Sequence, residues 1–92
     1  MVTTSTQTTA TTATDEIRID LREQAGPTTA RYTVDIMVDL YTKGYVRRPV
    51  ASPAMVPVWR SRIYNAARRL GVEVSTEKVT REDGLYVIGW VS

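Results

Sequence analysis

Cysteine and histidine are both missing from the 92 residues of this chain. Without cysteine there is no disulfide and no thiolate metal ligand. Without histidine the chain lacks the usual general base at neutral pH, the commonest metal ligand and every Ser-His or Cys-His pair. The adjacent acids Asp15–Glu16 and Glu82–Asp83 stand at a predicted strand start and in a predicted turn. We therefore expect a binding protein rather than an enzyme, with no metal and no cofactor.

Long apolar runs are missing as well, and so are the basic and apolar regions of a signal peptide. The sequence therefore predicts a soluble, cytoplasmic protein that does not enter a membrane. Phenylalanine is absent, and arginine outnumbers lysine ten to two, beside abundant valine, alanine and threonine. This composition is typical of a GC-rich genome.

Acidic residues are missing from one long interval, residues 45–71, which carries six arginines. In the segments before and after it, acids outnumber bases by two. A solvated surface usually mixes the two signs, whereas segregated basic charge attracts anions and is the electrostatic footprint of nucleic-acid binders. We expect nucleic acid as the partner. The alternatives are an acidic protein partner and a basic patch that serves only solubility.

The chain divides into a tail and one domain. Residues 1–14 contain eight threonines and no charged side chain, too little apolar surface to offset the entropy of ordering them, so a disordered tail is predicted. Residues 15–92 suit a single α+β domain. Its first residues, 16–23 (EIRIDLRE), alternate isoleucine or leucine with charged side chains, and this period of two predicts a strand with one buried face.

Residues 28–44 fit two patterns. Apolar and polar residues alternate in the middle of the segment, and its β-branched content favours a strand. As a helix the segment is capped by Thr28 or Thr29 and ends at Gly44, with Lys43 near the negative end of the helix dipole. The helix has one apolar stripe, formed by Thr33, Ile36, Met37, Leu40 and Tyr41. The caps and the length favour the helix, which we predict.

Residues 45–50 (YVRRPV) predict a short extended link, because Arg48 precedes a proline and is kept away from helical angles. A second helix is predicted over residues 52–71. The Ser-Pro pair at its start supplies the N-cap and the first helical residue, and the glycine at its end supplies the stop. Regular helix is expected from Pro57 onward.

The last residues predict a β-hairpin. Residues 72–79 and 85–92 are strand-like, and residues 81–84 (REDG) form the turn, with Gly84 able to take a positive φ. The second strand is apolar on both faces, with Tyr86, Ile88 and Trp90 on one and Leu85, Val87 and Val91 on the other. Such a strand is covered on both faces or presents one face to a partner.

At about one hundred degrees per residue, the second helix separates into an apolar stripe and a basic face. The stripe, which we expect in the core, is Val56, Trp59, Ile63, Ala66, Ala67 and Leu70. The other face has no glutamate to pair with its arginines. Arginine matches phosphate or the guanine edge, asparagine pairs with adenine, and serine and tyrosine suit phosphate oxygens. The predicted DNA contacts are Arg47, Arg48, Arg60, Ser61, Arg62, Tyr64, Asn65, Arg68, Arg69 and Lys78.

The order of a helix, an extended link, a basic helix and a hairpin predicts a small winged helix-turn-helix-like domain, whose second helix enters the major groove. The hairpin is a weak wing, because Lys78 and Arg81 stand among three acids. It is therefore also a candidate for packing or for homodimer formation. Exposed aromatic side chains that stack on bases are scarce, so duplex DNA ranks above single strands and RNA.

Residues 67–79 (ARRLGVEVSTEKV) resemble the end of the DNA-binding domain of the Lsr2 family, actinobacterial nucleoid-associated proteins. The residues that agree are Arg68, Arg69, Gly71, Val74, Ser75 and Thr76. That family inserts an Arg-Gly-Arg element into DNA, and Glu77-Lys78-Val79 stands there in this chain. The resemblance thus implies a general tie to the DNA-binding proteins of actinobacteria or their bacteriophages, without the minor-groove element. From the basic helix and the order of elements we expect a small DNA-binding protein, a transcriptional regulator or nucleoid-associated factor of a bacterium or phage. The alternative is a protein-interaction module that binds an acidic partner or self-associates through its hairpin.

Overall fold

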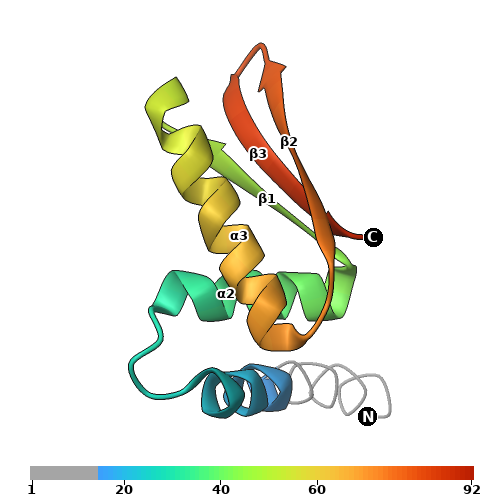
Figure 1. The fold of residues 1–92 in the computed structure, drawn as a ribbon. Coiled ribbons are helices and arrows are strands. Elements are labelled where there is room, and N and C mark those ends of the chain that lie inside the picture. Colours follow the sequence, from blue (N-terminus) through green and yellow to red (C-terminus); the bar gives the residue numbers. More distant parts are fainter. Residues whose placement is uncertain (1–14) are drawn as a thin grey trace, which may run out of the picture.

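The computed structural model describes residues 15–92, so the tail predicted for residues 1–14 lies outside the described residues. Residues 15–25 are helical. They are followed by the helix α2 (Arg31–Lys43), the strand β1 (Tyr45–Val50), the 3-10 turn η1 (Pro53–Met55), the helix α3 (Val56–Leu70) and the strands β2 (Val74–Arg81) and β3 (Gly84–Val91). Figure 1 shows α3 lying along the sheet, with α2 and the helical residues 15–25 below it. The described residues form an α+β fold, as predicted.

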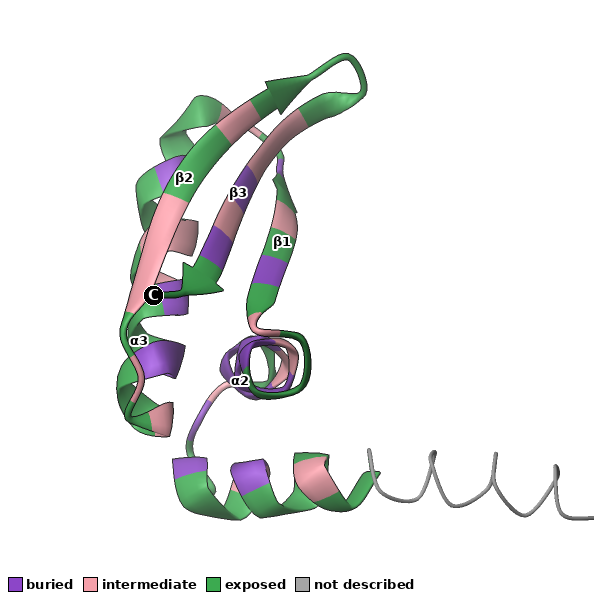
Figure 2. Cartoon of the chain, turned by 90° about the vertical axis from the view of Figure 1, so that its right-hand side faces the viewer, coloured by how far each residue is buried: buried purple, intermediate pink, exposed green. Residues whose placement is uncertain are grey.

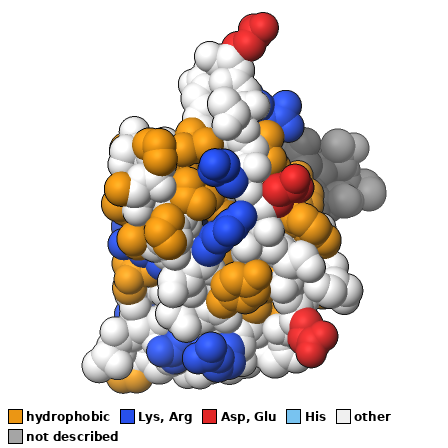
Figure 3. All heavy atoms as spheres, turned by 45° about the horizontal axis from the view of Figure 1, so that its top comes forward, with side chains coloured by type: hydrophobic (Ala, Val, Ile, Leu, Met, Phe, Trp, Pro, Cys, Tyr) orange, Lys and Arg blue, Asp and Glu red, His pale blue; other side chains and the backbone are white. Residues whose placement is uncertain are grey.

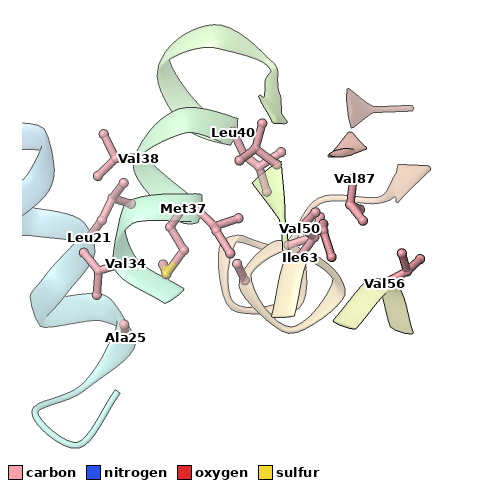
Figure 4. Packing of buried hydrophobic residues seen from close by; sticks show 14 residues of the cluster. Leu21, Ala25, Val34, Met37, Val38, Leu40, Val50, Val56, Ile63 and Val87 are labelled. Atoms are coloured by element: carbon pink, nitrogen blue, oxygen red, sulfur yellow. The ribbon is translucent and has the colours of Figure 1, made fainter. Parts of the chain in front are cut away.

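The strand predicted for residues 16–23 is wrong, because these residues lie within the helical segment 15–25. Leu21 is buried and Ile17 packs against the same core, whereas Ile19 is 58% exposed. The step of four from Ile17 to Leu21 belongs to a helical period as much as to an alternating one. Packing decides between the two, and Figure 4 shows Leu21 beside the side chains of α2.

The helix predicted between residues 28 and 44 is confirmed as α2, but it starts differently. Ala30 is its N-cap and no side chain caps it. The hydroxyl of Thr29 instead donates a hydrogen bond to the carbonyl of Ala25, at the end of the preceding helical segment. At the other end, Gly44 takes a φ of 79° and donates its N–H to the carbonyl of Leu40, as expected of a C-terminal glycine.

The buried face of α2 is wider than the predicted stripe. Its buried residues are Thr33, Val34, Ile36, Met37, Val38 and Leu40, whereas Tyr41 is 63% exposed. The helix is covered on two sides, because residues 15–25 lie under it and α3 packs over it. A helix buried in this way carries β-branched residues on several sides, which explains why the same segment also matches a strand.

The remaining predicted elements are confirmed with small shifts. The extended link predicted for residues 45–50 is the strand β1, which pairs with β3 as a third strand that was not predicted. The hairpin strands meet at a turn after which Gly84 has a φ of 146°. α3 begins at Val56 and ends before Gly71, whose φ is 76°. The Ser-Pro pair does not open this helix, because it forms the separate turn η1.

The three strands form one antiparallel sheet in the order β1-β3-β2, so β3 is central. α3 packs on one face of the sheet, and Figure 2 looks onto the other, which none of the helices in residues 15–92 covers. The largest fully buried side chains lie between α2, α3 and the sheet, namely Ile36, Met37, Ile63, Val46 and Val87. A Cβ on Gly89 would lie 2.7 Å from Cγ2 of Ile63, so this glycine lets α3 approach the sheet.

Candidate nucleic-acid interface

The side chains of α3, none of which is acidic, divide between the core and a solvent face. Val56, Ile63, Ala66 and Ala67 are buried, as predicted. Trp59 and Leu70 are only half-buried, so they border the core that they were predicted to fill. The Trp59 ring meets the Tyr32 ring of α2 edge to face, with the ring centroids 6.4 Å apart.

The solvent face of α3 is a stripe formed by Ser61, Tyr64, Asn65 and Arg68, here called the α3 face. All four are exposed, and they extend over about 10 Å at 1.5 Å per residue. Thr76 of β2 donates a hydrogen bond to the Tyr64 hydroxyl oxygen, with 3.2 Å between the oxygens. This bond leaves the proton of the tyrosine available for donation to an acceptor in solvent.

Arg62 stands at the margin of the α3 face toward α2. Its guanidinium carbon lies 4.2 Å from the centroid of the Tyr32 ring and 4.7 Å from that of the Trp59 ring. Stacking of this kind fixes the guanidinium plane while its N–H groups remain at the edges of the plane. Arg62 is thus held in place before any ligand arrives.

Arg60 and Lys78 stand at the opposite margin, toward the hairpin. The contact between Tyr64 and Thr76 sets the register of α3 against β2, and the two elements run in opposite directions (Figure 1). Arg60 lies one helical turn before Tyr64, and Lys78 lies two residues after Thr76 on the same face of β2. Both side chains therefore lie beside the line along which α3 contacts β2. Arg60 is half-buried, and its Nε has no hydrogen-bond partner among residues 15–92.

A cavity of about 630 Å³ lies between the C-terminal half of α3 and the start of α2. Its lining residues are Thr28, Thr29, Ala30, Tyr32, Thr33, Asn65, Arg68 and Arg69. The start of α2 has no side-chain cap and no acid in its first turn. Its unpaired N–H groups therefore add positive potential beside Arg68.

Arg69 has a structural role that the sequence did not reveal. Its Nη1 donates a hydrogen bond to the carbonyl of Ala25, 2.9 Å away. In return, the side-chain amide of Gln24 donates to the carbonyl of Arg69 at 2.8 Å. These two bonds tie the end of α3 to the helical residues 15–25.

The structure does not bring Arg47 and Arg48 to the α3 face. Arg48 forms an ion pair with Asp39 of α2, with 3.0 Å between the atoms. Arg47 extends from the opposite face of the sheet, where its guanidinium carbon is 5.3 Å from the centroid of the Tyr86 ring. Of the ten predicted contacts, seven therefore remain on or beside the α3 face: Arg60, Ser61, Arg62, Tyr64, Asn65, Arg68 and Lys78.

Figure 3 shows the molecule with the upper ends of α3 and the hairpin turned forward. Lys and Arg side chains lie in the middle of this surface and at its lower edge, beside hydrophobic side chains. Asp and Glu side chains lie toward its top and right. On this view the basic side chains thus lie among hydrophobic and uncharged ones, and the acidic side chains lie toward the margin.

A second charged cavity, of about 820 Å³, was missed by sequence reasoning. It is lined by Arg18, Arg22, Arg31, Val34, Asp35, Asp39 and Arg48. Most of these charged side chains already have partners within the molecule, because Arg18 forms an ion pair with Asp35 and Arg22 donates hydrogen bonds to two backbone carbonyls. The i,i+4 spacing of Arg18 and Arg22 was the available signal, and the strand assigned to this segment concealed it.

Comparisons of this chain with protein-family models, with curated proteins and with solved structures find no match. The resemblance of residues 67–79 to the Lsr2 family therefore stays a prediction. Within residues 15–92, no helix has the length and apolar character needed to cross a membrane. In the same part of the chain, no three carboxylates are grouped so that they could hold a metal ion.

Proposed function

We propose that this chain is a small DNA-binding protein, a regulator or nucleoid-associated factor of a bacterium or phage, and that it is not an enzyme. The α3 face would lie in the major groove of duplex DNA. The observation that carries the proposal is this face itself. Arg68 and Asn65 are exposed on it, basic side chains stand along both margins, and the interval 45–71 has no acid to oppose a phosphate.

Asn65 and Arg68 are suited to read base edges. They are three residues apart on one face of a helix, so their side chains are neighbours. Arginine binds guanine O6 and N7 with two hydrogen bonds, and asparagine binds adenine N6 and N7 in the same way. Ser61 and Tyr64 offer hydroxyl groups of the kind that position a helix on phosphates.

The two margins are suited to the two phosphate backbones. The major groove is about 12 Å wide, close to the diameter of a helix with its side chains. A helix seated in the groove therefore has one backbone on each side. Arg62 would meet one backbone, and Arg60 with Lys78 would meet the other.

The architecture supports the assignment of a winged helix-turn-helix. In this assignment α2 is the first helix, α3 is the recognition helix that reads the bases, and the β2–β3 hairpin is the wing. The order of elements and the sheet order β1-β3-β2 fit this assignment. Two features depart from it. β1 and η1 stand between the two helices in place of a turn of three or four residues. The tip of the hairpin is acidic, so only its Lys78 edge suits DNA.

The proposal is tested by mobility shift of the full chain on duplex DNA, single-stranded DNA and RNA, with salt titration of the duplex complex. We expect tightest binding to the duplex. The logarithm of affinity should fall with the logarithm of salt concentration at a slope of about −3, because three cations, Arg60, Arg62 and Lys78, contact phosphate. Arg81→Ala, on the far face of the sheet, is the matched control and should leave the slope unchanged. Absence of duplex binding at low salt would contradict the proposal and favour an acidic protein partner.

A further inference from the structure

The face of the sheet turned away from α3, here called the outer face, exposes large apolar side chains. Ile88 and Trp90 of the central strand β3 lie on it, and Trp90 is 37% exposed. Tyr45 of the edge strand β1 pairs directly with Trp90 and is 52% exposed. No helix in the described residues covers this face (Figure 2). Neighbouring exposed apolar side chains of this kind make the face a candidate interaction site.

The charges on the outer face are arranged in a row across the strands. Arg47 of β1 is the register partner of Ile88, and Ile88 is the register partner of Glu77 of β2. Side chains of register partners point to the same face. The row therefore reads basic, apolar, acidic from one edge of the sheet to the other. Arg47 and Glu77 are both exposed.

We infer that the outer face binds a second copy of this chain, face to face, about a two-fold axis parallel to β3. Such an axis places β1 of one copy over β2 of the other. Arg47 then meets Glu77 of the partner subunit on both sides of a central Ile88 pair. An axis across the strands would instead bring Arg47 against Arg47, which like charges disfavour. Two-fold pairing of one self-complementary patch is the commonest form of homodimer, and aligned sheets pack in this way.

The next row of side chains is compatible with the same axis. Tyr45, Trp90 and Ser75 follow one another across the sheet. The axis parallel to β3 sets the large Tyr45 of one copy over the small Ser75 of its partner. An axis across the strands through the Ile88 row would instead set Tyr45 over the partner subunit's Pro49. Charge thus selects the axis parallel to β3, and this row fits it.

The mixed charges on this face, with Glu77 and Asp83 beside Arg47 and Arg81, favour a second copy over a nucleic acid. Glu77 stands in the middle of β2, and Asp83 accepts a hydrogen bond of 2.7 Å from the Tyr86 hydroxyl. This bond with Asp83 raises the pKa of Tyr86 above its ordinary 10.0, with smaller contributions from burial and from the charge of Asp83. A phosphate backbone laid across the strands would meet these carboxylates, whereas the partner subunit's Arg47 pairs with one of them. The inference does not depend on the proposed function, because the α3 face lies on the other side of the sheet.

The dimer is tested by sedimentation equilibrium of the full chain. A three-stranded face is near the lower end of interface sizes, so a micromolar dissociation constant is expected. At about 100 µM the chain should sediment at twice the 10.3 kDa of one copy. A chain that stays monomeric up to about 500 µM would overturn the inference. Binding of single-stranded nucleic acid by this monomer, lost in Trp90→Lys, would assign the face to that ligand instead.

Charge reversal tests the orientation. Arg47→Glu and Glu77→Arg should each weaken the dimer about tenfold, and the double variant should restore it, because the reversed pair again attracts. Glu82→Arg, in the hairpin turn, is the control and should change nothing. Circular dichroism checks that each variant is folded. Equal dimerisation by all variants, or a folded double variant that stays weak, would overturn this arrangement.

Discussion

Gly89 is the point at which α3 comes closest to the sheet, and it gives a quantitative test of the packing. A Cβ at this position would lie 2.7 Å from Cγ2 of Ile63, whereas carbon atoms prefer a separation of about 3.5–4.0 Å. Overpacking a core by one methyl group costs about 1–3 kcal/mol. Replacing a glycine within a strand by alanine stabilises the folded state by about 0.5–1 kcal/mol, because the unfolded chain loses conformational entropy. We therefore expect Gly89→Ala to lower the free energy of unfolding by about 1–2 kcal/mol.

The cause is isolated by repeating the change in an Ile63→Ala background. Ile63→Ala alone should cost about 2–5 kcal/mol. In that background the new methyl meets no Cγ2 and fills part of the cavity, so Gly89→Ala should be neutral or stabilising. Urea unfolding followed by circular dichroism gives the four free energies of the cycle. A Gly89→Ala variant as stable as the parent, or an equal cost in both backgrounds, would refute the close approach of α3 to the sheet.

Three further predictions follow from the contacts of other residues. Arg69→Ala removes the hydrogen bond to the Ala25 carbonyl and should speed amide hydrogen exchange in residues 15–25 about tenfold, while exchange in the core of α3 stays slow. Unchanged exchange in residues 15–25 would show that this bond does not stabilise the segment. Asp39→Ala should cost about 1 kcal/mol in urea unfolding, since the pair with Arg48 is partly exposed; a cost near zero would show that solvent already screens the pair. In a dimer joined by its outer faces the two α3 faces point away from each other, so one dimer should bind two duplexes at once. An immobilised duplex should then capture a second, labelled duplex through the protein. Failure to capture the second duplex would contradict the combination of this dimer with this DNA surface.

The features that sequence reasoning predicted well are those decided by local chemistry. The glycines at positions 44 and 71 end their helices with positive φ angles, and residues 81–84 form the hairpin turn. These conformations depend on the residue itself and its immediate neighbours. The same holds for the solvent face of α3, whose helical period separated Ser61 and Asn65 from the core.

The features that it missed depend on residues far away in the chain. Residues 15–25 carry a pattern compatible with both a helix and a strand, and contact with the core selects the helix. Arg69 looks like a surface arginine until Ala25, which accepts its hydrogen bond, is seen beside it. Arg47 is separated from the α3 face by the sheet itself. A linear pattern of charges cannot distinguish arginines that serve the fold from those left for a ligand.

The central claim, that the α3 face reads duplex DNA, is tested most directly at Arg68. Fluorescence anisotropy would measure the affinity of the parent, Arg68→Ala, Arg68→Lys and the control Arg81→Ala for a duplex obtained by selection and for random duplex. We predict that Arg68→Ala loses about 1–3 kcal/mol on the selected site and less on random DNA, because a bidentate base contact is lost. Arg68→Lys should recover only part of the loss, since lysine keeps the charge without the fork, and Arg81→Ala should bind like the parent. Equal affinities of Arg68→Ala and Arg81→Ala on both duplexes would contradict the account.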